Sequence, residues 1–256
     1  APSEACASKP IGTGPFRFVS WTKNQKLVGE RNEDYWQIAP DGEPYPYADS
    51  IEFRPINDVE VRNQAIESGD INIMHTSDGE TIGDTLKDLR DDGKINMMVS
   101  EEAAEVSFVQ LNQTAPPFDD IRMRQALAMA ADRNQINDII NAGLPTIADS
   151  PFASDSIAYV EDPGFPEYDK AKAEELIKEY VADGGKPEFT LHATNSPTVK
   201  RLAELIQQRA KAVGVTVKIV LRDQAGLIND AIGKAYQAML FRNYPGGDPD
   251  SLYVWF

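Results

Sequence analysis

Cysteine and histidine are almost absent from this sequence of 256 residues, which contains one cysteine, Cys6, and two histidines, His75 and His192. A single cysteine excludes a disulfide bond within the chain. A structural zinc site needs about four nitrogen or sulfur ligands, and the chain has neither an H-E-x-x-H nor a C-x-x-C pair. We therefore expect no metal. Nickel has little support, because nothing in the sequence places the two histidines together.

Nucleotide and nucleophile motifs are missing as well. The chain has no G-x-x-x-x-G-K-[ST] phosphate loop and no G-x-S-x-G nucleophile turn. Gly12 and Gly14 begin like a dinucleotide fingerprint, but Arg17 stands where its third glycine would be. We therefore expect no cofactor.

Long apolar runs and positive charge are also scarce. No stretch approaches the ~18 apolar residues that suggest a membrane-spanning helix, and the start, APSEACASKP, lacks the basic and apolar regions of a secretory signal, as a processed chain also would. With 25 basic and 41 acidic residues, the formal net charge is -16. This charge disfavours nucleic acid and anionic membrane surfaces as partners. The 41% apolar and 26% charged residues are typical of a globular protein.

Acidic side chains are abundant, and several form adjacent pairs such as Glu101-Glu102 and Asp119-Asp120. Paired carboxylates act as general acid and base in glycosidases, so a carboxylate-dependent hydrolase is one hypothesis. So many acidic residues also produce adjacent pairs by chance, and these serve as surface charge or in the first turn of helices. The pairs alone do not indicate an enzyme.

Apolar periodicity and turn residues predict strands and helices through the first 105 residues. A helix is expected over Asp58–Ser68, with Asp58 as its cap and Gly69 just past its end. Strands at Ser50–Pro55 and Ile71–Met74 would make this segment a βαβ unit. The other expected elements are strands at Gly14–Ser20, Lys26–Gly29 and Ile95–Val99, a helix at Thr81–Asp91 and a loop at Asp34–Tyr47.

The remaining sequence is more regular, and its last part predicts a β-α-β-α-β order. That order implies a parallel sheet flanked by helices. The expected strands are Glu105–Leu111, Phe189–Ala193, Val215–Leu221 and Tyr236–Phe241. The expected helices are Ile121–Arg133, capped by Asp119 or Asp120, then Lys170–Ala182, Thr198–Val213 and Ala225–Lys234, with a surface segment without regular structure at Pro145–Pro166.

Polar residues follow the three strands of this β-α-β-α-β segment. They are Asn195, Ser196, Arg222, Arg242, Asn243 and Tyr244. Ligands of open parallel sheets bind beyond the carboxyl ends of the strands, so these residues should line one edge. Arg242 could hold a carboxylate with two hydrogen bonds, and Tyr244 and Trp255 could supply flat apolar walls. Structural roles stay open, with Ser196 as a helix cap and Arg222 as a surface ion-pair partner.

Six motifs follow one another in order along nearly the whole chain. They are P-I-G-T-G-P-F (10–16), R-N-E-D-Y-W (31–36), S-I-E-F-R-P-I with A-I-E-S-G-D-I (50–56 and 65–71), L-N with P-F-D-D-I-R-M-R-Q-A-L (111–112 and 117–127), Y-D-K-A-K-A (168–173) and G-D-P-D (247–250). No single motif is decisive, but the ordered set resembles the solute-binding proteins of family 5. These are the extracellular receptors of ABC importers for peptides, nickel and related solutes.

The resemblance implies an α/β fold like that of periplasmic binding proteins (type II-like), with two lobes that close on a ligand like a clamshell. It implies that residues 1–105 belong to lobe I and residues 106–256 form most of lobe II, with a hinge near residues 109–113. Full members extend further at both ends, so the architecture here would be incomplete. Asp248, in the G-D-P-D motif, joins the candidate ligand-binding residues.

The resemblance also implies a location and a partner. The protein would be a bacterial or archaeal receptor in the periplasm or at the cell surface. It would deliver a small solute, a peptide or an anionic compound, to the permease subunits of an ABC transporter. Contact with the membrane would come only through the permease or through a lipid anchor that this chain lacks.

One departure from the family pattern bears on the ligand. Peptide-binding members resemble one another in placing an aspartate three residues before the aspartate of the G-D-P motif, where it meets the free amine of a peptide. That position holds Pro245 here, and the cationic Arg242 lies close by. The missing charge-assisted hydrogen bond is worth about 1.5–3 kcal/mol. We therefore expect an anionic ligand, or a peptide held by another group than its amine.

Two alternatives to a receptor stay open at this point. A hydrolase such as a glycosidase would turn over a sugar or an ester. A partial domain without activity would leave apolar surface free for dimerisation.

Overall fold

The computed structural model of the chain describes residues 9–100, 105–243, 248–253 and 255. It divides into two compact units, residues 1–74 and residues 75–256, which are treated separately below. The lobe boundary expected between residues 105 and 106 is a different division, and it stays a prediction. Among the residues described, no helix is both long enough and apolar enough to cross a membrane.

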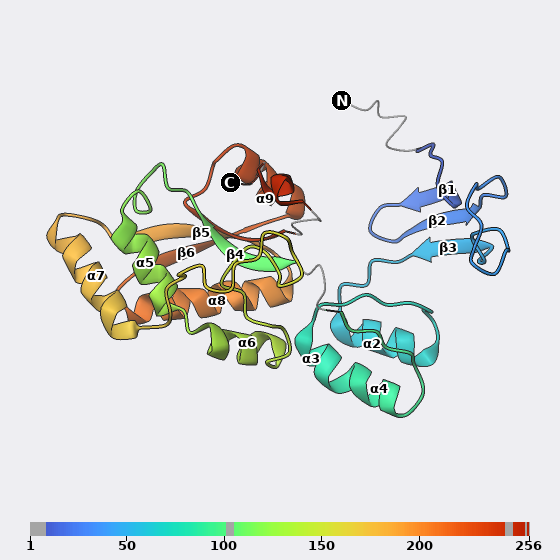
Figure 1. Ribbon diagram of the computed structural model, residues 1–256, viewed down its shortest axis with the longest axis horizontal. Helices are drawn as coiled ribbons and strands as arrows, with labels where there is room; N and C mark the ends of the chain where they lie inside the picture. The colour runs from blue at the N-terminus through green and yellow to red at the C-terminus, as the bar shows by residue number, and fades with distance from the viewer. Residues whose placement is uncertain (1–8, 101–104, 244–247, 254, 256) are drawn as a thin grey trace. The chain divides into compact units, whose positions relative to one another are not determined.

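The first unit contains an antiparallel sheet of three strands, β1 (Phe16–Thr22), β2 (Lys26–Arg31) and β3 (Ser50–Phe53), in that order (Figure 1). A turn joins the first two strands, in which Gln25 N donates to Thr22 O at 3.0 Å. The three predicted strands of this sheet are thus confirmed.

A helix, α2 (Val59–Ser68), follows the sheet, and its two ends are those predicted. Asp58 accepts a hydrogen bond from Val61 N at 3.0 Å, and Gly69 ends the helix with φ of 77°, a conformation that favours glycine.

The predicted βαβ unit is wrong. Ile71–Met74 forms no strand, since the chain folds back on the helix with Ile71 N donating to Ala65 O at 3.1 Å. The strand before the helix pairs antiparallel with β2 instead. The strand expected at Ile95–Val99 is absent as well. Short apolar runs of this kind do not distinguish a strand from a packed coil.

The second unit is built on a four-stranded sheet in the order β4-β7-β5-β6. Its strands are β4 (Val106–Leu111), β5 (Glu188–Thr194), β6 (Thr216–Arg222) and β7 (Ala238–Asn243). Strand β5 runs parallel to both β6 and β7, while β4 pairs antiparallel with β7. The predicted β-α-β-α-β segment and its parallel sheet are therefore confirmed.

The other regular elements described in this unit are helical. They are α3 (Gly79–Thr81), continued by the π-helical η1 (Ile82–Leu86) and by α4 (Lys87–Asp91), then α5 (Ile121–Ala130), α6 (Arg133–Asn141), α7 (Lys170–Ala182), α8 (Pro197–Ala212), α9 (Gln224–Ile232) and the 3₁₀ turn η2 (Pro249–Leu252). The segment Pro145–Pro166 contains neither helix nor strand, as expected.

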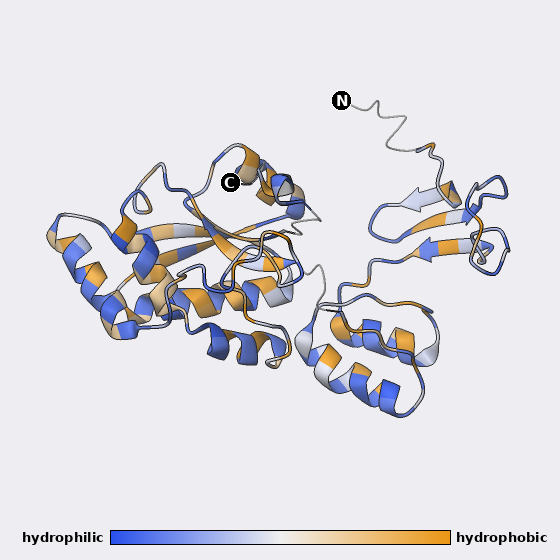
Figure 2. Ribbon diagram, in the orientation of Figure 1, coloured by the Kyte–Doolittle hydropathy of each residue, from blue (hydrophilic) through white to orange (hydrophobic). Residues whose placement is uncertain are grey.

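The hydrophobic core lies on both faces of the sheet. One face packs against α5, α7 and α8, with Phe118, Met123 and Leu191 fully buried. The other face packs against α9 through Leu227, Met239 and their neighbours. Hydrophobic residues accordingly gather on the strands and on the helix faces turned toward them (Figure 2). The strands whose ends form the candidate edge are therefore packed on both faces by buried side chains.

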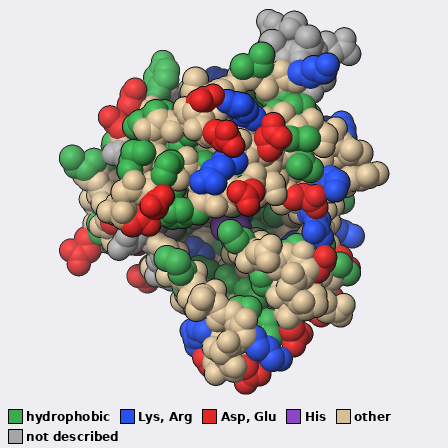
Figure 3. Space-filling model, turned by 90° about the vertical axis from the view of Figure 1, so that its right-hand side faces the viewer, with side chains coloured by type: hydrophobic (Ala, Val, Ile, Leu, Met, Phe, Trp, Pro, Cys, Tyr) green, Lys and Arg blue, Asp and Glu red, His purple; other side chains and the backbone are tan. Residues whose placement is uncertain are grey.

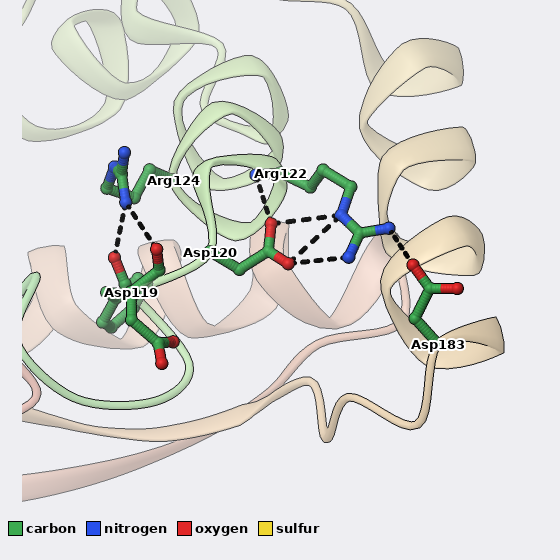
Figure 4. Close-up of polar contacts among 6 residues, drawn as sticks. Asp119, Asp120, Arg122, Arg124 and Asp183 are labelled. Carbon is green, nitrogen blue, oxygen red and sulfur yellow. Dashed lines mark hydrogen bonds and ion pairs between the residues drawn. The ribbon is translucent and has the colours of Figure 1, made fainter.

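The P-F-D-D-I-R-M-R motif forms the start of α5 (Figure 4). Asp120 caps the helix by accepting from Arg122 N at 2.8 Å, and the Arg122 guanidinium turns back to the same carboxylate at 2.7 Å. Arg122 also reaches Asp183 beyond the end of α7 at 2.7 Å. Arg124 donates to the backbone carbonyls of Phe118, at 2.7 Å, and Asp119. The motif is therefore explained by capping and helix packing.

The predicted helix Ile121–Arg133 is too long. It ends at Ala130, and a second helix, α6, begins at Arg133. The break arises at Asp132, which has an extended backbone and accepts from Gln135 N at 3.1 Å. An aspartate can either continue a helix or cap the next one, and here the cap prevails.

Candidate functional site

The candidate site is the edge of the second unit where the parallel strands end. Strand β5 lies between β7 and β6, so the three carboxyl ends are neighbours at one edge. Asn195 N, just after β5, donates to Arg222 O at the end of β6, at 3.1 Å. The edge predicted from the sequence is thus present.

Asn195 and Ser196 lie exposed between β5 and α8. Ser196 occupies the cap position of α8 with an extended backbone, and Pro197 is the first helical residue. The Ser196 side chain makes no capping hydrogen bond. The predicted cap position is therefore confirmed, but the Ser196 hydroxyl makes no bond to the first turn of the helix.

Arg242 lies in β7, directly opposite Ser107 of β4. Its guanidinium has two long contacts, one from Nε to Glu105 Oε2 at 3.3 Å and one from Nη1 to Ser77 Oγ at 3.4 Å. The side chain is 59% exposed. A guanidinium has five N–H donors, and two of the nitrogens of Arg242, Nε and Nη1, have a partner among the described residues.

The other candidates near the end of β7 differ in how far the structure describes them. Asn243 is the last residue of the strand, and only its backbone is described. Tyr244 and Pro245 lie outside the described residues. Asp248 is exposed and caps η2 by accepting from Asp250 N at 3.0 Å. The Trp255 ring packs on Phe241, with ring centroids 4.9 Å apart.

Arg222 points to the opposite face of the sheet, where it meets His192 and α9. Asp230 of α9 accepts from Arg222 Nε at 2.9 Å, and its carboxylate lies 2.8 Å from His192 Nδ1. The prediction that Arg222 is an ion-pair partner is confirmed. The Arg222 guanidinium, and then the His192 ring, hold the pKa of Asp230 below its ordinary value of 3.8. Sequence reasoning missed this cluster, since its members are far apart in the chain.

We expect Asp230→Asn to lower the free energy of unfolding by about 1–3 kcal/mol near neutral pH, because it removes a charged acceptor from two buried or half-buried donors. A carboxyl whose pKa is lower in the folded state adds stability above its unfolded pKa, and this contribution is lost as the pH falls through the folded pKa. The stability difference between the variant and the wild type should therefore shrink below about pH 4.

Urea unfolding at several pH values measures this difference. Asp88→Asn, at an exposed position on α4, is the matched control and should change stability little. A difference that stays constant from neutral pH to pH 3 would contradict the role given to Asp230.

Metal binding finds no support in the part of the chain that the structure describes, where no three histidine, cysteine, aspartate or glutamate side chains converge on one point. His192 faces Asp230 and Arg222. On the face drawn in Figure 3, acidic and basic side chains are interspersed. The negative net charge is therefore not gathered into one patch there.

Each unit has a surface recess among its described residues. One of about 330 Å³ lies in the first unit, lined by Trp21, Phe53 and the turn between β1 and β2. The other, of about 520 Å³, lies between α7 and the end of α8. Neither includes a residue predicted to bind ligand.

Comparison with known proteins decides the family. Residues 2–256 match the pattern of the "Bacterial extracellular solute-binding proteins, family 5 Middle". This chain belongs to that family. The two-lobed, periplasmic-binding-protein-like fold class expected from the six motifs, with its incomplete architecture, is confirmed by the solved structures that match.

Three similar proteins illustrate the range of family 5. A di/tripeptide-binding protein of Pseudomonas aeruginosa is 32% identical over 95% of this chain and 44% of its own length. The DppA periplasmic binding protein of Helicobacter pylori, solved with the peptide STSA, has a TM-score of 0.82 and 27% identity over 96% of this chain and 46% of its own.

The third is MoaA from A. tumefaciens R10, solved with mannopinic acid, with a TM-score of 0.81 and 26% identity over 98% of this chain and 49% of its own. The chain thus spans less than half the length of these relatives.

Proposed function

We propose that this chain is part of a solute-binding receptor that captures a small solute outside the membrane and delivers it to an ABC-type importer without catalysing a reaction. The observation that carries this proposal is the family match over residues 2–256. Two of the similar proteins, both of Pseudomonas aeruginosa, are named for binding di- and tripeptides. A location in the periplasm or at the cell surface and a permease as partner belong to the same proposal.

The ligand site in this proposal is the strand edge, with Asn195, Ser196, Arg242, Asn243, Tyr244 and Asp248 as its residues. Asn195 and Ser196 are exposed there, and the Ser196 hydroxyl makes no cap bond. Among the described residues, Arg242 contacts Glu105 at 3.3 Å and Ser77 at 3.4 Å. These features favour a ligand with a carboxylate. Two relatives were solved with a peptide, STSA, and with mannopinic acid. Mannopinic acid and a peptide with a free carboxyl end both carry a carboxylate.

Closure of two lobes around the ligand completes the proposal. Lobe I would comprise residues 1–105 and lobe II residues 106–256, with the hinge near residues 109–113. Binding would then shift the population from open to closed forms, because the closed form offers contacts from both lobes.

A thermal-shift screen tests the proposed function. The probes are STSA and other di- to pentapeptides, glutathione, mannopinic acid, free amino acids, sugars and nickel. A ligand at a hundredfold excess over its Kd adds about 2.7 kcal/mol to the stability of the folded state. For a chain of this size the midpoint should rise by roughly 5–10 °C. A rise with carboxylate-bearing peptides or acids supports the proposal, and no rise with any probe contradicts it.

A further inference from the structure

A short segment of the second unit, Ser77–Thr81, lies across the edge that contains the proposed site. We name these five residues the strap. Ser77 Oγ accepts from Arg242 Nη1 at 3.4 Å, at the end of β7. Asp78 Oδ2 accepts from Thr198 Oγ1 at 3.5 Å, in the first turn of α8. Consecutive residues of the strap therefore contact two elements of the edge.

The polar contacts of the strap are individually weak. The bonds from Arg242 and Thr198 are at the long limit for hydrogen bonds. The ion pair between Glu80 and Arg201 of α8 is 3.8 Å long, with both side chains more than half exposed. Such exposed pairs contribute about 0–1 kcal/mol. The polar contacts alone would not hold the strap in place.

Packing at Gly79 supplies the missing constraint. Gly79 is buried, and its backbone lies directly against the backbone of Asn141 at the end of α6. A Cβ built on Gly79 would overlap the Asn141 carbonyl group. Only glycine allows this approach. The placement of Ser77 beside Arg242 therefore depends on a residue with no side chain.

We propose that the strap is a positioning element for the ligand site, and that docking of Gly79 on Asn141 orders Arg242 for a ligand carboxylate. The inference rests on the proposed function. Ser77 and Glu105 contact different nitrogens of the guanidinium, Nη1 at 3.4 Å and Nε at 3.3 Å, and together they set its direction. On the proposed boundary the strap belongs to lobe I and Arg242 to lobe II, so the strap orients the guanidinium when the lobes are closed. A ligand carboxylate then takes the place of Glu105. Strap docking and ligand binding then strengthen each other.

Gly79→Ala tests the strap directly, with Gly83→Ala as the matched control. A Cβ on Gly83 would meet its nearest neighbour, Leu144 Cδ1, at an ordinary 3.4 Å. We expect Gly79→Ala to weaken binding of STSA or mannopinic acid at least tenfold by calorimetry. Gly83→Ala should bind as the wild type does.

A double-mutant cycle with Arg242→Ala separates positioning from general damage. If the strap acts through Arg242, Gly79→Ala should add little to the loss caused by Arg242→Ala. Thr198→Val, which removes the strap's hydroxyl partner on α8, is the milder second variant and should weaken binding in the same direction. Thr198→Val replaces Gly79→Ala as the test of the strap if Gly79→Ala fails to fold.

The outcomes distinguish the two proposals. Suppose that the wild type binds a probe. If Gly79→Ala binds it equally well, or if the affinity lost through Gly79→Ala adds fully to the affinity lost through Arg242→Ala, the strap has no positioning role and the proposed function stands. If Gly79→Ala fails to fold, unchanged binding by Thr198→Val has the same meaning. If the wild type binds none of the probes, the proposed function fails and the role of the strap fails with it.

Discussion

Arg242→Ala should weaken binding of the solute at least tenfold while leaving the fold intact. The guanidinium lies at the exposed end of β7, and its two present contacts are long. A charge-assisted hydrogen bond to a ligand carboxylate contributes about 1.5–3 kcal/mol, and each 1.4 kcal/mol is about a tenfold change in Kd. Calorimetric titration of the variant and the wild type with STSA or mannopinic acid measures the change.

Arg222→Ala provides the matched control for Arg242→Ala. It removes the same charge from the end of β6, which β5 separates from β7, and from the opposite face of the sheet, where Arg222 pairs with Asp230. It should lower stability and leave affinity unchanged. Arg242→Lys should recover only part of the affinity, because an ammonium lacks the planar fork of the guanidinium. Equal affinities for Arg242→Ala and the wild type would remove Arg242 from the site.

Leu191→Ala should lower the free energy of unfolding of the second unit by about 3 kcal/mol, within the range measured for buried leucines. Leu191 is fully buried in β5, which pairs with strands on both sides. Truncation leaves a cavity in the core that supports the strand edge. The thermal midpoint should fall by roughly 6–12 °C, as measured by calorimetry.

Leu221→Ala is the control for the buried leucine. Leu221 lies on the neighbouring strand β6 and is 41% exposed. The same truncation there should cost less than about 1 kcal/mol, because a half-exposed side chain loses little burial and leaves no cavity. Similar losses for both variants would show that the core does not lie where the structure has it.

Much of the second unit could be predicted because its signals are local. The helix at Lys170–Ala182 has an aspartate cap and ends before Gly184-Gly185, and the structure has it over that same range. The strands on either side of α8 alternate and are bounded by turn residues. The failures also have a local cause: at Asp132 a cap signal competes with helix periodicity, and the short run Ile71–Met74 is apolar without being a strand.

The sequence predicts the strand edge of the candidate site, but not the contacts that other segments make with it. The ends of parallel strands meet by a general rule, which placed Arg242 at the edge. Its partner Ser77 is 165 residues away in the sequence, and Thr198 is 120 residues away from Asp78. No periodicity or motif links such residues. The close approach at Gly79 could not be foreseen either, because it depends on the path of a different helix.

The family motifs bear on structure more than on the ligand. The P-F-D-D-I-R-M-R segment caps α5 and ties it to the end of α7. Arg122, first by its hydrogen bond to Asp120, holds the pKa of that carboxyl below its ordinary value. Asp120 thus caps the helix through its carboxylate and Asp119 accepts from Arg124 through its backbone carbonyl, which gives no support to a carboxylate-dependent hydrolase. The similarity of this motif to the family pattern therefore does not identify the ligand.

The most direct test of the account is calorimetric binding of STSA in three forms: the free peptide, its C-terminal amide and its N-acetyl derivative. We expect the amide to bind at least about tenfold more weakly than the free peptide, because Arg242 loses its carboxylate partner. The N-acetyl peptide should keep its affinity, because Pro245 stands where an amine anchor would be. The role of Arg242 as a carboxylate partner would be contradicted if the C-terminal amide bound as well as free STSA while the N-acetyl derivative lost its affinity.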